Sequence, residues 1–187
     1  MTEEPIVQTG APARVPATAS DRIRASISDG FLFLPIILLD SSFGSLTESQ
    51  ALIFAYGLLS QHLGWIYNVL FHGYRGQTLG KSLRNIEVVR TSDGAPLGYR
   101  RAFLRDSPYV VMCLICSVAW TYSNVAWWGG WQTDAGDEFV NKVYSAASWF
   151  SIGWCLLEVA SFSLHPQRRA IHDLIAGSIV VIKQRQH

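Results

Sequence analysis

The sequence predicts an all-α membrane protein with four transmembrane helices and a small cytoplasmic cap. Of its 187 residues, 49% are hydrophobic and only 16% are charged, whereas about 25% of the residues in an average soluble domain are charged. The basic residues are also distributed very unevenly along the chain. A soluble helical bundle would need a charged face on each long helix, and two of the apolar segments have none.

Four segments approach the roughly 20 residues that a helix needs to cross a bilayer. These predicted spans are residues 23–43, 50–71, 107–127 and 143–164. They define one transmembrane domain over residues 21–187. Residues 1–20 are rich in Pro, Ala and Thr and begin with acidic residues, which predicts a disordered cytoplasmic tail rather than a signal peptide.

The placement of Lys and Arg predicts the orientation of the four spans. Fourteen of the fifteen basic residues fall on one side of a chain that crosses four times, and Lys142 is the exception. The basic side is cytoplasmic by the positive-inside rule. Both termini are therefore predicted to be cytoplasmic. The run WWGGW at residues 127–131 is predicted to form an aromatic belt at the outer interface.

The basic loop between the second and third spans is too patterned to be a linker. Residues 86–89 and 178–181 are β-branched runs, and we expect them to pair because lone strands leave backbone groups unsatisfied. Residues 98–106 predict a short basic helix that lies along the headgroups, with Phe103 and Leu104 at the acyl boundary. The side chains expected to bind anionic lipid headgroups are Arg100, Arg101, Arg105, Arg168 and Arg169.

The sequence gives no support for hydrolytic or redox catalysis. The turn GQTLGK at residues 76–81 lacks the glycine spacing of a phosphate-binding loop. Cys113 and Cys116 have C-x-x-C spacing within an apolar run, where packing explains them better than metal or redox chemistry. No Ser–His–Asp spacing and no run of metal ligands is present. We expect no enzyme activity, cofactor, metal or nucleic-acid partner.

Three motifs in the basic segments occur in a fixed order. They are RIRASISD at residues 22–29, GQTLGKSLRNIEVVRTSDGAPLGYRRAFLRD at 76–106 and RRAIHDLIAGSIVV at 168–181. In these motifs the chain resembles the RDD family of bacterial membrane proteins, which is named for one arginine and two aspartates. The resemblance covers most of residues 22–182. It assigns the arginine to Arg22, with Arg24 as an alternative, and the aspartates to Asp29 and Asp173.

The resemblance implies a multi-pass protein of the bacterial inner membrane and leaves two functions open. A transport role is proposed for the family, and some members are reported as sodium–proton antiporters, which implies cation/proton exchange. Other members are associated with different proteins, which implies a non-catalytic subunit that scaffolds or assembles a larger membrane complex. Four spans are few for a transport path, so we expect a homo-oligomer or a subunit of a larger complex.

The charged residues themselves leave two roles open. Asp29 is an intramembrane acid and so a candidate ion or proton carrier, but Arg22, Asp29 and Asp173 could instead form a charged clasp that pins the terminal segment. Glu158, near the middle of the fourth span, could relay protons with His62, since histidine titrates near neutral pH. A protonated Glu158 bonded to a neighbouring helix is the alternative. His172, beside Asp173, is a further secondary candidate.

Overall fold

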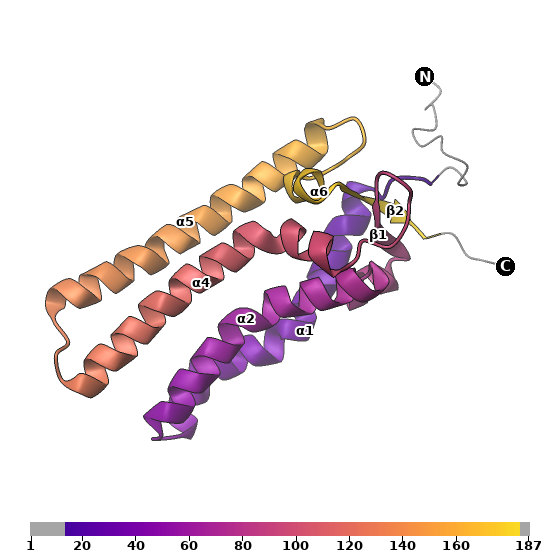
Figure 1. Ribbon diagram of the computed structural model, residues 1–187. Helices are drawn as coiled ribbons and strands as arrows, with labels where there is room; N and C mark the ends of the chain where they lie inside the picture. Colours follow the sequence, from indigo (N-terminus) through magenta and orange to yellow (C-terminus); the bar gives the residue numbers. More distant parts are fainter. Residues whose placement is uncertain (1–13, 184–187) are drawn as a thin grey trace. The chain divides into compact units, whose positions relative to one another are not determined.

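Four long helices dominate the computed structural model, which describes residues 14–183 (Figure 1). They are α1 (Ala19–Leu46), α2 (Gln50–Arg75), α4 (Tyr99–Gly129) and α5 (Asp134–Leu164). Each predicted span lies within one of them. Among the described residues, α4 and α5 are long and apolar enough to cross a membrane. The prediction that α1 and α2 cross as well stays a prediction.

The shorter elements lie in the two basic segments. The helix α3 (Leu79–Leu83) and the strand β1 (Ile86–Arg90) separate α2 from α4, and the helix α6 (Ile171–Ala176) and the strand β2 (Ser178–Ile182) follow α5. The two strands pair in antiparallel fashion, with Val88 opposite Val180. The predicted pairing of the two β-branched runs is therefore confirmed.

Both outer edges of this small sheet receive further backbone hydrogen bonds. On the β2 side, the Ala17 amide donates to the Val180 carbonyl at 2.9 Å. On the β1 side, the Arg90 amide donates to the Ala95 carbonyl at 2.9 Å. A lone two-stranded ribbon is only marginally stable in water, so these bonds add to the support that the strands give each other.

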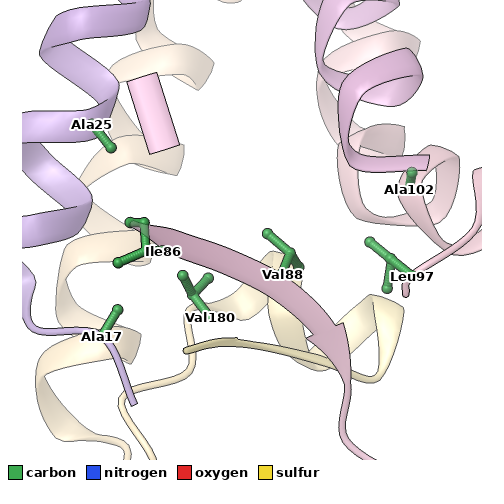
Figure 2. Close-up of a cluster of buried hydrophobic side chains, with 7 residues drawn as sticks. All are labelled: Ala17, Ala25, Ile86, Val88, Leu97, Ala102 and Val180. Carbon is green, nitrogen blue, oxygen red and sulfur yellow. The ribbon is translucent and has the colours of Figure 1, made fainter. Parts of the chain in front are cut away.

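A cluster of buried aliphatic side chains joins the sheet to the helices beside it. Figure 2 shows Ile86 and Val88 on β1 close to Val180 on β2. Ala17 and Ala25 flank the cluster at one end of β1, and Leu97 and Ala102 flank it at the other. All seven are almost fully buried. Segments distant in sequence therefore share one core, which fixes where the charged residues of the same segments lie.

The chain divides into two compact units. Within the described residues, the first unit comprises the part up to Leu32, Tyr67–Asp106 and the part from Leu156 onward, and the second comprises Phe33–Ile66 and Ser107–Cys155. The first unit contains the sheet and both short helices. In the second unit, α2 and α4 pack closely: the Trp120 indole lies against Gly57, and its Nε1 donates to the Phe54 carbonyl at 3.3 Å.

Three expectations about local structure differ from the structure. The predicted tail over residues 1–20 overlaps the fold, because Ala17 joins the sheet edge and α1 begins at Ala19; residues 1–13 lie outside the described part. The predicted helix over residues 98–106 is the start of α4, because no glycine or capping residue ends it and Pro108 interrupts only one backbone bond. The predicted turn at residues 76–81 runs into α3.

Candidate functional site

Asp173 lies at the centre of the most buried group of charges in the first unit. It belongs to the first turn of α6, and its carboxylate is fully buried. Oδ2 accepts a hydrogen bond from Arg22 Nη1 at 2.7 Å, and Oδ1 accepts one from Arg105 Nε at 3.0 Å. Oδ1 also accepts from the Ser178 hydroxyl at 3.2 Å, and Oδ2 from the Ala170 amide at 3.3 Å. One carboxylate thus joins α1, α4 and the terminal segment.

Arg22 and Arg105 are almost as buried as the carboxylate between them. Their side chains are 14% and 6% exposed. Arg22 also stacks on the ring of Phe162, 5.4 Å from its centroid. We expected Arg105 to bind lipid headgroups, but a buried side chain that pairs with Asp173 is not available to them. Sequence position alone could not separate Arg105 from the exposed Arg100, because both lie in the same basic run.

Arg105 extends the cluster to Glu158 through His172. Arg105 Nη2 lies 2.6 Å from His172 Nε2, and His172 Nδ1 contacts a carboxylate oxygen of Glu158. Because a guanidinium can only donate, Nε2 of His172 must accept, and its proton sits on Nδ1 and is donated to Glu158. Glu158 is therefore paired with His172 rather than with His62.

His72 extends the same cluster toward α3. Lys81 Nζ lies within hydrogen-bond distance of His72 Nε2, and Arg105 Nη1 lies 3.3 Å from the same nitrogen. Both neighbours are donors, so Nε2 accepts and Nδ1 carries the proton, which reaches the Asn68 carbonyl one turn earlier in α2. The neutral imidazole thus connects the Lys81 amine and the Arg105 guanidinium without adding a charge of its own.

Asp29 is bound by a separate set of partners. Its carboxylate accepts hydrogen bonds from the Tyr67 hydroxyl at 2.8 Å, the Thr78 hydroxyl at 2.6 Å and the Gly80 amide at 2.7 Å. Gly80 approaches so closely that a Cβ there would lie 2.1 Å from the Ala25 carbonyl oxygen. The carboxylate therefore caps the start of α3, and the site of Asp29 is distinct from the pair of Arg22 with Asp173.

The two charged centres shift pKa values in ways that follow from burial and neighbouring charge. Burial alone would raise the pKa of Asp173, but the positive charge of Arg105, together with that of Arg22, outweighs it and holds the pKa well below its usual range. Burial lowers the pKa of Lys81 to about 7, and the positive charge of Arg105 adds to this shift. The carboxylates of Asp106, Asp173 and Asp29 oppose it only in part.

Of the other predicted arginines, three are exposed and two donate to main-chain carbonyls of the terminal segment. Arg24, Arg100 and Arg168 are exposed. Arg101 Nη1 lies 3.4 Å from the Gly177 carbonyl oxygen, and Arg169 Nε donates to the Ser178 carbonyl at 2.9 Å, so both arginines also contact the terminal segment.

His62 lies in the second unit. Its Nδ1 accepts from Trp65 Nε1 at 2.9 Å, so its Nε2 holds the proton and lies 3.0 Å from the Ser117 hydroxyl. The Ser117 hydroxyl in turn donates to the Cys113 carbonyl at 2.9 Å.

Several residues of the site were missed by sequence reasoning. Thr78 carried a usable signal, because a threonine before a short helix is a favoured N-cap, and its hydroxyl accepts from the Lys81 amide. Tyr67 and His72 carried none, since Tyr67 lies within the predicted second span and His72 directly follows it. Asp106 was also missed; its Oδ2 is buried and has no hydrogen-bond partner among residues 14–183. In the same described range, no group of three or more His, Cys, Asp or Glu could hold a metal ion.

A family model matches the part of the chain that contains both charged centres, and the match ends just before β2. The sequence model of the RDD family matches residues 14–177. The chain belongs to the RDD family. RDD proteins are membrane proteins, in agreement with the two apolar helices of this chain. No curated protein and no solved structure matches the chain. Of the three residues assigned to the RDD name, Arg22 pairs with Asp173, whereas Asp29 caps α3.

We predict that Asp173→Asn strongly destabilises the first unit. The substitution leaves Arg22 and Arg105 buried without their counter-charge, and breaking a buried pair in this way costs about 3–5 kcal/mol. Thermal unfolding of the full chain in mild detergent, together with its abundance in membranes, measures the effect.

The matched control is Asp93→Asn, which weakens the ion pair between Arg90 and the 49% exposed side chain of Asp93. An exposed pair contributes about 0–1 kcal/mol. Equal losses in the two variants would contradict the clasp. Because Asp29 and Asp173 share no hydrogen-bond partner, the effects of Asp29→Asn and Asp173→Asn are expected to be nearly additive.

A second prediction concerns pH. Lys81 has a pKa of about 7 in the folded chain against an ordinary value of 10.5, so between these values the unfolded chain holds a proton that the folded chain has released. Raising the pH through this window therefore favours folding. The unfolding temperature of the wild type should rise relative to that of Lys81→Met from pH 7 to pH 10. Parallel curves for the two proteins over this range would disprove the assignment.

Proposed function

We propose that the chain crosses the bacterial inner membrane four times, with both termini and the first unit's charged cluster on the cytoplasmic side. The placement of fourteen of fifteen basic residues supports this orientation. Large apolar side chains on α1 and α2 are exposed, for example Phe31 at 68%, Leu38 at 61% and Leu59 at 56%. Side chains of this size avoid water, so the same surfaces are suited to lipid.

We further propose that the protein is a non-catalytic membrane subunit that assembles with a larger complex or with further copies of itself. The supporting observation is that the acids expected to carry ions are already bound by protein donors. Asp29 accepts three hydrogen bonds, Asp173 is held by two arginines, and Glu158 pairs with His172. A carboxylate whose oxygens already accept hydrogen bonds from the protein stabilises the fold and has little remaining capacity to bind a transported cation.

Cation/proton antiport is the second candidate, and one residue favours it. Asp106 has a buried carboxylate oxygen without a hydrogen-bond partner among the described residues, on the same helix as Arg105. Such an oxygen can accept a proton or a cation at little structural cost. Asp106, rather than Asp29, is therefore the acid to test if the chain exchanges ions.

Cysteine labelling tests the orientation. The proposal predicts that Ser45→Cys and Thr133→Cys react with a membrane-impermeant maleimide in intact cells, because Ser45 lies at the outer end of α1 and Thr133 lies in the outer loop between α4 and α5. Ser92→Cys should react only after the cells are opened, because it lies in the basic loop. The parent chain, with its three native cysteines, is the background control. Labelling of Ser92→Cys in intact cells would reverse the orientation.

Transport and assembly can be separated with the full chain in everted vesicles. The subunit proposal predicts no cation-dependent pH change above vesicles without the chain, and a complex of fixed stoichiometry after purification in mild detergent. Exchange that is present in the wild type and lost in Asp106→Asn at normal abundance would instead establish antiport. Asp93→Asn, on an exposed turn, is the matched control for the loss of one carboxylate.

A further inference from the structure

Two short helices of the first unit present large apolar side chains outward, and each is held in that orientation by a carboxylate that contacts its first turn. In α3, Leu79 and Leu83 are four residues apart and so share one face. Their side chains are 44% and 73% exposed. The opposite face is fixed, because the buried Gly80 donates its amide to Asp29. The leucines cannot turn inward without breaking this cap.

The helix α6 has the same construction. Leu174 and Ile175 are 42% and 45% exposed, while Asp173 and Ala176 are buried. The ion pairs of Asp173 with Arg22 and Arg105 fix which side of α6 faces the protein. The hydrogen bonds and ion pairs that hold α3 and α6 therefore fix the outward direction of their aliphatic side chains.

An exposed arginine lies next to each apolar face in the sequence, whereas the acids that cap the two helices are directed inward. Arg84 directly follows Leu83 and is exposed, and Arg168, three residues before α6, is exposed as well. The acids of the same two helix caps, Asp29 and Asp173, are directed inward and bound. A surface with aliphatic side chains beside arginines complements a layer of anionic headgroups over acyl chains.

We propose that α3 and α6 are interfacial anchors, with Leu79, Leu83, Leu174 and Ile175 inserted into the acyl boundary of a bilayer that contains anionic lipid. Arg84 and Arg168 then lie among the lipid phosphates, where long basic side chains commonly extend. The inference rests on the proposed membrane topology and adds to it that the short helices, which cannot span, are immersed. The turn around Ser92, which is exposed and polar, stays in water.

Immersion can be measured with single cysteines in the full chain. Cys113, Cys116 and Cys155 are first replaced by alanine, and Leu83→Cys, Ile175→Cys or Ser92→Cys is then labelled with an environment-sensitive fluorophore. The proteins are reconstituted in vesicles of phosphatidylcholine and phosphatidylglycerol. We expect labels at 83 and 175 to be quenched by nitroxide-bearing lipid and protected from aqueous iodide. The label at 92 should show the reverse.

A further label separates the inference from the topology on which it rests. Val118 is 70% exposed within the apolar part of α4, so Val118→Cys reports whether that helix lies in lipid. A label at 118 that is quenched by lipid, with labels at 83 and 175 as accessible to iodide as the one at 92, overturns the anchors alone. A label at 118 that is accessible to iodide overturns the membrane topology as well.

Two other occupants of these faces give different results. If a second copy of the chain covered α3 and α6, protection from iodide would be lost as the protein is diluted with lipid, and the proposal would be wrong. If only charge attracted the helices, Arg84→Gln would abolish the protection of the label at 175 along with that at 83. Protection that persists on dilution, and that Arg84→Gln reduces only at 83, supports insertion.

Discussion

The buried carboxylate of Asp173 is the contact on which the arrangement of the first unit depends. Taking a carboxylate out of water costs several kcal/mol unless opposite charges and hydrogen bonds replace the solvent. Here Arg22 and Arg105 supply the charge, and Ser178 and the Ala170 amide complete the shell. Each donor comes from a different part of the chain. The compensation is complete only when α1, α4, α6 and the start of β2 are all in place, so one carboxylate makes four segments interdependent.

Asp29 also stabilises the fold by accepting hydrogen bonds with its carboxylate, but what it stabilises is the start of a short helix. A five-residue helix such as α3 has too few internal hydrogen bonds to be stable alone. A carboxylate at its start satisfies the free Gly80 amide and favours the helix dipole. The Thr78 and Tyr67 hydroxyls hold the carboxylate in that position. The two aspartates thus have related tasks, since each fixes a short helix against the ends of the long ones.

Much of the fold could be predicted because it follows from short-range patterns. The long apolar runs gave helices that contain all four predicted spans, and the β-branched residues gave the correct strand pair. The assignment of partners could not be predicted in the same way. Arg105 and Arg100 lie in one basic run, yet only Arg105 faces inward, because the direction of each side chain depends on where α4 begins and on what packs beside it. His72 and Lys81 meet for the same reason, through the tertiary fold and not through any local signal.

The register of the sheet has a consequence for the order of events during synthesis. Ile86 pairs with Ile182, so a strand made before the third and fourth long helices waits for one made after them. Arg22 and Arg105 wait as well, since their carboxylate is residue 173. While the ribosome is still translating the residues between 105 and 173, both arginines are cations without their partner, and β1 has no strand to pair with. The first unit can therefore complete its fold only late, through contacts between residues distant in the sequence. In a nascent chain that stops before α6, Arg22 and Arg105 have no counter-charge, whereas in the finished protein both are nearly buried and paired.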